Sequence, residues 1–526
     1  MTTAEQPHVT QVVVNRIALD YSATPAVILE GTGTVALPFS LRLHGARALR
    51  EATIVALGDT TARAGSRWSA RFDLLGTTWT GTALAPRSGR YWLRACAGDG
   101  SALGLGVTAE LPAGQLIEQV AHVRFELVQG ELNLVFGPPL TDRERGARQQ
   151  QSLESDYRSL VPAIQNAVFF ESFFGQNASC NPLAIDRALA RIRPDIARYW
   201  SVVDASVAVP AGAIRLIEGS ADWWQLRAGA RLLVVNDWLR SRFVQRPHQT
   251  VLQTWHGTML KRLALNRKRL GLRAIVATLR ESSRWSILLA QNAYSARIFR
   301  GAYGFLGPIW QEGYPRNDVL RATEPGVTDL GATDFVATEL RSRLGISADA
   351  TVVLYAPTWR DDRPDHIDHL DVAAFTKALG ADVITLIRGH SRTLTPGHEV
   401  HAANVIDVTA YPDVSELYLV ADVLITDYSS VMFDFSVTGK PIFFYTPDLE
   451  HYREKLRGFY FDLIEVAPGP VVAVLSELVD LVIDRAAVAV RFTERYAAWQ
   501  HRFNPRDDGG AADRVVHRLL AEGKIG

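Results

Sequence analysis

The sequence predicts an α/β fold with parallel sheets, preceded by an all-β region. From Val9 to about Phe136, short alternating or β-branched runs are broken by Gly, Asp, Ser and Pro, a pattern typical of a β-sandwich. From about residue 161 onward, apolar strand patterns alternate with helical patterns, which favours a parallel sheet with helices on both faces. After a linker at residues 324–331, a second alternating unit begins at Thr351.

Length and composition limit the classes of function. With 526 residues, 47% of them apolar and 21% charged, the chain is a globular protein of about three domains. We place these domains at residues 1–140, 141–325 and 326–526. Lys+Arg and Asp+Glu both number 56, so the total charge does not indicate a nucleic-acid partner. Two cysteines, Cys96 and Cys180, are too few for a disulfide framework or a zinc site.

The start of the chain and its hydropathy predict the cellular compartment of the protein. The segment MTTAEQPHVTQ lacks the basic start and the apolar core of a signal peptide. No stretch reaches the ~20 uninterrupted apolar residues that a membrane helix needs. We therefore expect a cytoplasmic protein that does not span a bilayer.

The all-β region contains several aromatic residues but no obvious catalytic cluster. Trp68, Trp79, Tyr91 and Trp92 could form a platform for a carbohydrate, but burial in the core is the commoner explanation for such residues. We expect a structural role or an accessory glycan-binding role for this region.

One predicted strand of the first α/β unit ends at a histidine. Strands are predicted at residues 167–170, 201–203, 213–217 and 231–236, with a helix at 182–191. A further strand starts at Thr250 and runs into Trp255-His256-Gly257-Thr258. Ligands of a doubly wound sheet bind beyond the carboxyl ends of its strands, so His256 is a candidate general base. Gly257 would allow close backbone approach and Thr258 would cap a helix. The alternative is a histidine packed in the core.

A basic segment without acidic residues follows. Its basic residues are Lys261, Arg262, Arg267, Lys268, Arg269, Arg273 and Arg280, and they alternate with Leu, Ile and Val. This pattern resembles an amphipathic segment that lies on an anionic membrane surface. The alternatives are a solvated helix face or a groove for an anionic polymer.

The second α/β unit has its own polar strand ends. Arg316, in a turn before the linker, is a candidate phosphate contact or a simple turn residue. Thr351 to Tyr355 is a predicted strand with the exit loop APTWR, and a strand at 383–387 leads into Arg388-Gly389-His390. A cleft between the two units would bring His256 and His390 together. The nearby acidic residues at 361, 362 and 365 lack the spacing of a calcium loop, so we expect a solvated loop there.

The stretch DVLITDYSSVMFDFSVTGKPIFFY, residues 422–445, reads as strand, helix and strand. Ser429 and Ser430 stand at the predicted helix start, where backbone N–H groups and hydroxyls favour a phosphate. Asp434 follows on the same helix face and could bind the hydroxyls of a polyol. The alternative is that the serines only cap the helix and that Asp434 is a partner of the helix dipole.

Eight stretches in order identify a family that this chain resembles. They are FFESFFGQNASCNPLAI, LQTWHGTMLKRL, NAYSARIFRGAYG, EGYPRNDVL, YAPTWRDD, LIRGH, the stretch from ADVLITDYSS to FYFD, and FNPRDDGGAADRVV. From about Val161 to Arg518 the chain resembles the CDP-glycerol glycerophosphotransferases of the teichoic acid polymerase type. The resemblance implies a GT-B architecture of two facing Rossmann-like domains.

The resemblance also implies roles for individual residues. His256 would take the proton from the acceptor hydroxyl, and His390 with Arg388 would hold the pyrophosphate and the leaving CMP. The implied substrate-binding positions are Trp255, Gly257, Thr258, Met259, Arg316, Pro357, Thr358, Arg388, Gly389, Ser429, Ser430 and Asp434. Met259 stands where the family commonly has proline, and Gly389 replaces a larger residue. These two departures leave the identity of the polyol open.

The implied reaction joins a CDP-polyol and an acceptor to give a polyol-phosphate acceptor and CMP. The expected partners are the CDP-polyol, with glycerol preferred over ribitol, a polyol-phosphate or lipid-linked glycan acceptor, and an anionic membrane surface at the inner face of the cell membrane. We expect no nucleic-acid partner and no tightly bound cofactor, although Mg²⁺ could assist the donor pyrophosphate. The alternatives are a GT-B glycosyltransferase that uses a nucleotide sugar and a non-catalytic polymer-binding protein.

Overall fold

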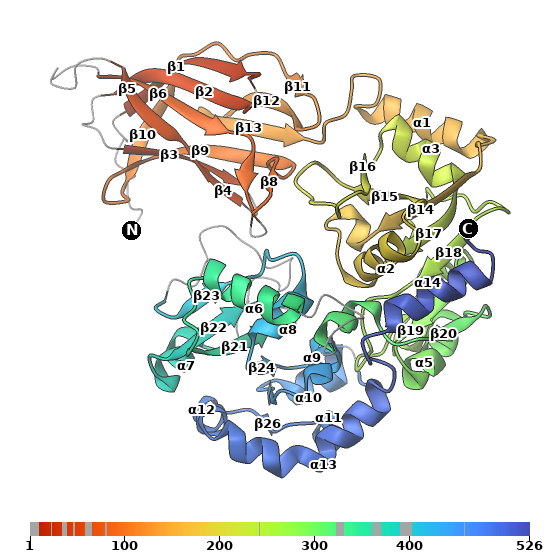
Figure 1. Cartoon of the computed structure of the whole chain (residues 1–526). Coiled ribbons are helices and arrows are strands. Elements are labelled where there is room, and N and C mark those ends of the chain that lie inside the picture. The colour runs from red at the N-terminus through yellow and green to blue at the C-terminus, as the bar shows by residue number, and fades with distance from the viewer. Residues whose placement is uncertain are drawn as a thin grey trace.

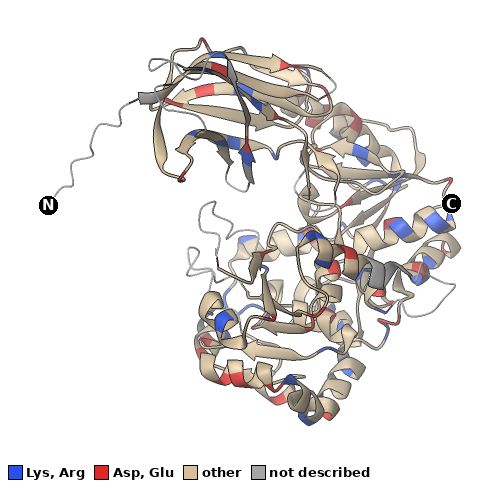
Figure 2. Cartoon of the chain, turned by 60° about the vertical axis from the view of Figure 1, so that its left-hand side comes forward, with Lys and Arg blue, Asp and Glu red and all other residues tan. Residues whose placement is uncertain are grey.

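The chain forms an all-strand region followed by two α/β units (Figure 1). The computed structural model describes residues 10–22, 24–33, 39–45, 48–57, 66–78, 81–240, 242–321, 331–358, 360, 370–389, 402–456 and 458–526. Basic and acidic residues are interspersed over all three parts (Figure 2), as their equal totals suggest.

Only strands are found among the described residues from 10 to 137. They are β1 (Thr10–Asp20), β2 (Ala26–Gly33), β3 (Phe39–Gly45), β4 (Ala48–Glu51), β5 (Thr53–Leu57), β6 (Ser66–Asp73), β7 (Gly76–Thr77), β8 (Ala83–Leu84), β9 (Gly89–Ala97), β10 (Ala102–Val107), β11 (Gln115–Ile117), β12 (Ala121–Val128) and β13 (Glu131–Gly137). Most pairs are antiparallel, but β1 and β10 are parallel. Alternate residues of β2, β6, β9 and β13 share one apolar core, so the strands are buried on one face.

The aromatic residues of this region favour the core explanation over a carbohydrate platform. Trp68 and Tyr91 are buried in the common core, where Trp68 packs edge-on against Phe39. Trp92 is half-buried, and Trp79 lies outside the described residues. Since at least two of the four rings are inaccessible to a sugar, the platform hypothesis is wrong for Trp68 and Tyr91.

The first α/β unit has a parallel sheet of order β16-β15-β14-β17-β18-β19-β20. Its strands are β14 (Gln165–Glu171), β15 (Ala197–Val202), β16 (Ile214–Ile217), β17 (Ala230–Val235), β18 (Thr250–Gln253), β19 (Ile287–Ala290) and β20 (Ile309–Gln311). Its helices are α1 (Ala147–Ser159), α2 (Cys180–Ile192), α3 (Ala221–Gly229), α4 (Leu272–Ser282) and α5 (Ala293–Tyr303), with short 3-10 turns η1 (Phe173–Gly175), η2 (Ala264–Asn266) and η3 (Pro315–Leu320). Two separate apolar clusters cover its two faces, so the predicted sheet with helices on both sides is confirmed.

The second α/β unit has a parallel sheet of order β23-β22-β21-β24-β25-β26. Its strands are β21 (Thr351–Ala356), β22 (Val383–Ile387), β23 (Val405–Asp407), β24 (Val423–Thr426), β25 (Ile442–Tyr445) and β26 (Val471–Val472). Its helices are α6 (Gly331–Arg343), α7 (Val372–Leu379), α8 (Val414–Val420), α9 (Val431–Phe435), α10 (Leu449–His451), α11 (Leu463–Val466), α12 (Leu475–Ile483) and α13 (Arg485–Phe503), with the turns η4 (Ser436–Thr438) and η5 (Tyr452–Leu456). The strand, helix and strand predicted at 422–445 are therefore present.

The last helix departs from the predicted division of the chain. We placed residues 326–526 together, but α14 (Ala511–Ala521) packs against α2 of the first unit (Figure 1). Val515, Val516 and Leu519 are buried in the same apolar cluster as β14 and β15. The carboxylate of Asp318 accepts hydrogen bonds from the first backbone N–H groups of α14, at Ala511 (2.9 Å) and Ala512 (2.7 Å). The apolar face of α14 and this cap direct the end of the chain back to the first sheet.

No described helix is long and apolar enough to cross a membrane.

Candidate active site

His256 lies just beyond the carboxyl end of β18, as predicted. Its Nδ1 is 2.7 Å from the backbone carbonyl oxygen of Asn236, which follows the neighbouring strand β17. A carbonyl can only accept, so Nδ1 carries the proton in the neutral ring and Nε2 keeps its lone pair. The half-buried imidazole therefore has the tautomer that a general base at Nε2 requires.

Two aromatic rings hold the imidazole. Trp255 stacks on it with ring centroids 5.0 Å apart and an interplanar angle of 14°. The ring centroid of Phe173 lies 5.4 Å from that of the imidazole. Trp255 has a φ of +54° and Phe173 a φ of +46°, values that these residues rarely adopt. Backbone strain of this kind is typical of functional sites, where the surrounding structure must maintain it.

An acidic side chain lies beside His256 that the sequence patterns did not single out. Burial raises the pKa of Asp237 above its ordinary value, and the nearby imidazole of His256 partly opposes this shift. One Asp237 oxygen accepts a hydrogen bond from the backbone N–H of Trp238 at 2.8 Å. No second hydrogen bond to this carboxylate is found among the described residues.

Thr258 does not cap a helix, so that prediction is wrong. No helix starts in the described residues from 254 to 263. The Thr258 hydroxyl instead enters a buried polar network with Gln291 and with Ser295, whose hydroxyl oxygen is 3.0 Å away. The carbonyl of the buried Met259 accepts a hydrogen bond from the Tyr294 hydroxyl at 2.9 Å. Both residues thus anchor the histidine loop to α5.

The residues after the histidine loop contact the second α/β unit. Lys261 forms an isolated antiparallel bridge with Phe459, and the Arg262 N–H donates to the Gly458 carbonyl at 3.0 Å. The Tyr460 N–H donates to the carbonyl of Leu260 at 2.8 Å. The first part of the predicted basic segment is therefore held between the two units.

Arg316 is buried at the junction of the two units. One guanidinium nitrogen donates to the His256 carbonyl at 2.9 Å and to the sulfur of Cys180 at 3.1 Å. The other donates to Asp434 at 2.5 Å. Burial alone would lower the pKa of Arg316, but Asp434 raises it well above the ordinary value, so the guanidinium is charged. Arg316 therefore holds the histidine loop and α9 of the second unit together.

Asp434 faces this arginine. Its carboxylate also accepts a hydrogen bond from the Asn317 side chain at 3.1 Å, and the residue is 2% exposed. Burial raises the pKa of Asp434, and Arg316 opposes the shift. Because both oxygens have protein partners, the observed role of Asp434 is to join the units. Direct contacts of Asp434 with a polyol, and of Arg316 with a phosphate, stay predictions.

The predicted serines meet the histidine loop. A Cβ added to Gly257 would lie 2.9 Å from the Ser430 hydroxyl oxygen, so the two loops are in close contact. Ser430 precedes α9 without a side-chain capping bond. Within the described ranges, neither the Ser429 nor the Ser430 hydroxyl has a hydrogen-bond partner. The capping-only alternative therefore lacks the bond it requires, and phosphate binding by these hydroxyls stays a prediction.

Pro357 and Thr358 follow β21 and are half-buried. The Thr358 N–H donates to both oxygens of Asp427, at 2.8 and 3.0 Å. Arg360, 2% exposed, donates to Asp427 at 2.7 Å and to Asp448 at 2.8 and 2.9 Å. This buried ion cluster fixes the loops beside Ser429. The sequence patterns missed it, because Arg360 lies 67 residues from Asp427 and 88 residues from Asp448 along the chain.

The strand end at Arg388 is only partly described. One guanidinium nitrogen of Arg388 donates to the carbonyls of Val408 (3.3 Å) and Tyr411 (2.8 Å), and burial lowers the pKa of this side chain. The Gly389 N–H donates to the Thr409 hydroxyl at 2.9 Å. His390 lies outside the described residues, so its predicted meeting with His256 stays a prediction.

The polar network behind Arg316 includes the tail of the chain. Asp507 accepts hydrogen bonds from Gln291 (2.7 Å), from the Tyr314 N–H (2.9 Å) and from Asn504 (3.1 Å). Burial raises the pKa of Asp507 to about 6. The network thus links the Thr258 loop, η3 and the segment after α13 in one buried unit.

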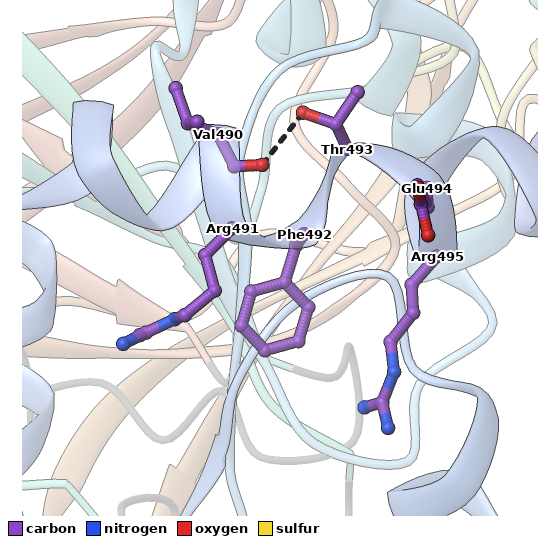
Figure 3. A pocket seen from close by; sticks show the side chains of 6 residues that line it. All are labelled: Val490, Arg491, Phe492, Thr493, Glu494 and Arg495. Atoms are coloured by element: carbon purple, nitrogen blue, oxygen red, sulfur yellow. Dashed lines mark hydrogen bonds between the residues drawn. The ribbon is translucent and has the colours of Figure 1, made fainter.

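A surface hollow elsewhere on the protein is unrelated to these residues. It lies along α13 and is lined by Val490 to Arg495, with Arg491 and Arg495 beside the ring of Phe492 (Figure 3). None of the predicted site residues lines it. In the described part of the chain, no group of three or more His, Cys, Asp or Glu side chains is placed to hold a metal ion.

Comparisons with known proteins show the family of this chain. A family model described as CDP-Glycerol:Poly(glycerophosphate) glycerophosphotransferase matches residues 155–521. The "Teichoic acid poly(glycerol phosphate) polymerase" of Bacillus subtilis (strain 168) is 35% identical over 382 residues, which are 69% of this chain and 50% of that protein. The "Teichoic acid glycerol-phosphate transferase" of Staphylococcus aureus (strain NCTC 8325 / PS 47) is 35% identical over 375 residues, 68% of this chain and 93% of that protein.

A solved structure of the wall teichoic acid polymerase TagF has a TM-score of 0.65 and 33% sequence identity, over 72% of this chain and 95% of that chain. This chain thus spans about half the length of the Bacillus polymerase and nearly all of the TagF structure. The family match begins after the all-strand region, which it does not include.

Proposed function

Because the chain belongs to the CDP-glycerol:poly(glycerophosphate) glycerophosphotransferase family, we propose that it transfers glycerol phosphate from CDP-glycerol to a hydroxyl of a teichoic-acid-type acceptor. One observation carries the proposal. His256 Nδ1 contacts the backbone carbonyl of Asn236, and the histidine loop contacts Ser430 of the other unit, which supports a base beside the predicted donor site.

In the proposed reaction, Nε2 of His256 takes the proton of the acceptor hydroxyl. The acceptor oxygen attacks the phosphorus that carries glycerol, and the bond from this phosphorus to CMP breaks. Ser429 and Ser430 would donate hydrogen bonds to the phosphate oxygens, and Arg388 with His390 would neutralise the charge that develops on CMP. Any Mg²⁺ would arrive with the donor pyrophosphate rather than occupy a site of protein ligands.

The proposed architecture is a GT-B pair. The two parallel sheets would form its facing halves, and the all-strand region would be an accessory domain. Contacts between Ser88 and Asp204, where the Ser88 N–H donates to the carboxylate at 2.7 Å, support a fixed place for this domain beside the first half.

The first test is CMP release from CDP-glycerol in the presence of a soluble glycerol-phosphate acceptor. We expect His256→Ala to lower the rate about 10²- to 10⁴-fold, because the acceptor hydroxyl loses its base. The matched control is His517→Ala, which changes an exposed histidine of α14 and should leave the rate unchanged. Retained turnover in His256→Ala would refute the assignment of the base.

Product analysis separates the three readings of the sequence. Phosphorus NMR should show a new phosphodiester with CDP-glycerol and a lower yield with CDP-ribitol. A glycosidic bond formed from a nucleotide sugar would instead support a glycosyltransferase. Binding of the polymer without any turnover would support a non-catalytic role.

We also propose that α4 places the enzyme at the inner face of the cell membrane. Leu272, Val276 and Leu279 are 81%, 63% and 44% exposed on this helix, while Arg273 and Arg280 are exposed beside them. Leu306, 92% exposed, follows two residues after Gly304, which lies close to the Leu279 side chain. Exposed apolar residues flanked by basic ones favour an anionic bilayer surface over a solvated helix face.

Vesicle binding tests this surface. The double variant Arg273→Glu/Arg280→Glu should bind vesicles of phosphatidylglycerol at least roughly 30-fold more weakly, since each basic residue near the surface contributes about 1 kcal/mol. Arg491→Glu/Arg495→Glu makes the same change of charge on α13 and should bind normally. Equal binding by both variants would place the membrane contact elsewhere, or show that it is absent.

A further inference from the structure

Asn236 contacts both His256 and the turn that carries Phe173. We propose that Asn236 is a positioning residue for the transfer reaction, which holds the turn at residues 172–180 so that Phe173 keeps the imidazole directed at the acceptor. This inference rests on the proposed function for its catalytic consequence, but its structural part can be tested separately.

Every polar group of the Asn236 side chain is used. Its Oδ1 accepts a hydrogen bond from the Phe173 N–H at 2.8 Å, and its Nδ2 donates to the Ser172 hydroxyl oxygen at 3.2 Å. Its backbone carbonyl accepts the 2.7 Å hydrogen bond from His256. One fully buried residue therefore binds the base through its main chain and the neighbouring turn through its side chain.

The turn needs such an anchor. Phe173, Phe174 and Cys180 have φ values of +46°, +56° and +66°, in the left-handed region that side chains with a Cβ avoid. Each such residue costs of order 1–3 kcal/mol, so the conformation persists only where tertiary contacts impose it. The Arg240 guanidinium supports the far side of the turn, donating to the Phe174 carbonyl at 3.2 Å.

Phe173 links this turn to the imidazole of His256. The ring of Phe173 contacts the imidazole, on which Trp255 also stacks. Without the Asn236 side chain, the Asn236 backbone carbonyl would still accept the hydrogen bond from His256, but Phe173 would be released. The imidazole would then rotate about its remaining hydrogen bond, and Nε2 would lose its fixed direction.

The main test compares rates of CMP release from CDP-glycerol. Asn236→Ala should lower kcat by up to about 100-fold, with little change in the KM for CDP-glycerol, since the donor half is untouched. Asn133→Ala truncates another fully buried asparagine, in the all-strand region, and should leave both constants unchanged. An unchanged kcat in Asn236→Ala would overturn the inference.

A double variant tests whether Asn236 acts through the turn. If it does, Asn236→Ala/Phe173→Ala should be little slower than the slower single variant, because both changes remove the same restraint. Losses that multiply would show that Asn236 acts independently of Phe173, and would overturn the proposed route.

A spectroscopic measurement keeps the inference testable if the wild-type chain releases no CMP, a result that would reject the proposed function alone. In protein with labelled histidine, the signal of His256 is identified by its absence in His256→Gln. Asn236→Ala should shift this signal and change the balance of its two tautomers, and Asn133→Ala should not. An unchanged His256 signal would overturn the inference whatever the activity.

Discussion

Gly257 allows the loops of the two α/β units to touch. A methyl group at this position would meet the Ser430 hydroxyl oxygen at 2.9 Å and its Cβ at 3.0 Å, closer than such atoms normally approach. Glycine is thus required here because a larger side chain would not fit, and not because of the backbone angles. At the scale of a single residue, the distance between the histidine loop and Ser430 depends on the absence of one side chain.

Gly257→Ala should therefore reduce catalysis. We expect kcat/KM for CDP-glycerol to fall by roughly 10- to 100-fold, because the loops must separate by a few tenths of an ångström or more and the reacting groups lose alignment. Steady-state CMP release measures the effect. Gly301→Ala is the control, since a Cβ there would find its nearest neighbour at an ordinary 3.8 Å, on Asn266. Equal rates for Gly257→Ala and the wild-type protein would show that the loops adapt.

At the scale of elements, α14 is attached to the first unit by a buried carboxyl group. Asp318 caps the helix start, and burial raises its pKa to about 7 although two backbone N–H groups oppose the shift. The unfolded chain gives this group its ordinary pKa of 3.8. The folded protein therefore binds the proton more tightly, and stability from this group is complete below pH 3.8 and lost as the pH rises to about 7.

Asp318→Asn should flatten this dependence. Between pH 6 and 7 the free energy of unfolding of the wild-type protein should fall with a slope of up to about 1.4 kcal/mol per pH unit from Asp318. Asp507 has a pKa of about 6 and also contributes to the slope in both proteins, so the difference between the two slopes reports Asp318. Urea unfolding at several pH values measures the slopes. Identical slopes for the variant and the wild-type protein would contradict the raised pKa of Asp318.

At the scale of the whole molecule, the pair of Arg316 and Asp434 joins the two units. Both side chains are almost fully buried, at 8% and 3% exposure. A buried charge without its partner is strongly unfavourable, because neither water nor another charge compensates it. The relative placement of the halves, and with it the assembly of the site, depends on this contact and on the Asp507 network behind it.

Arg316→Ala should leave Asp434 buried and unpaired. We expect a loss of about 3–5 kcal/mol in the free energy of unfolding and a larger radius of gyration in X-ray scattering, as the halves separate. Arg198→Ala breaks the buried pair of Arg198 and Asp186, which lies within the first unit. This control should be destabilised similarly without an increase in radius. An unchanged radius in Arg316→Ala would mean that other contacts fix the two units.

The sequence by itself determined the strands and helices, the parallel sheets and the site loops that follow single strands. Short-range hydrophobic periodicity encodes these features, because burial of a face repeats every two or 3.6 residues. His256, Ser429 and Thr358 were therefore placed at strand ends without a structure. The family was also recognisable from motif order, and the comparisons confirm it.

Only the tertiary structure decided how distant residues meet. It placed Arg316 against Asp434, 118 residues further along the chain, and returned α14 to the first sheet. It also showed that Thr258 enters a buried network instead of capping a helix, and that Asn236 joins Phe173 to His256. The physical reason is that a buried polar group takes whichever partner the fold brings near. That choice depends on long-range packing, which no local pattern of residues contains.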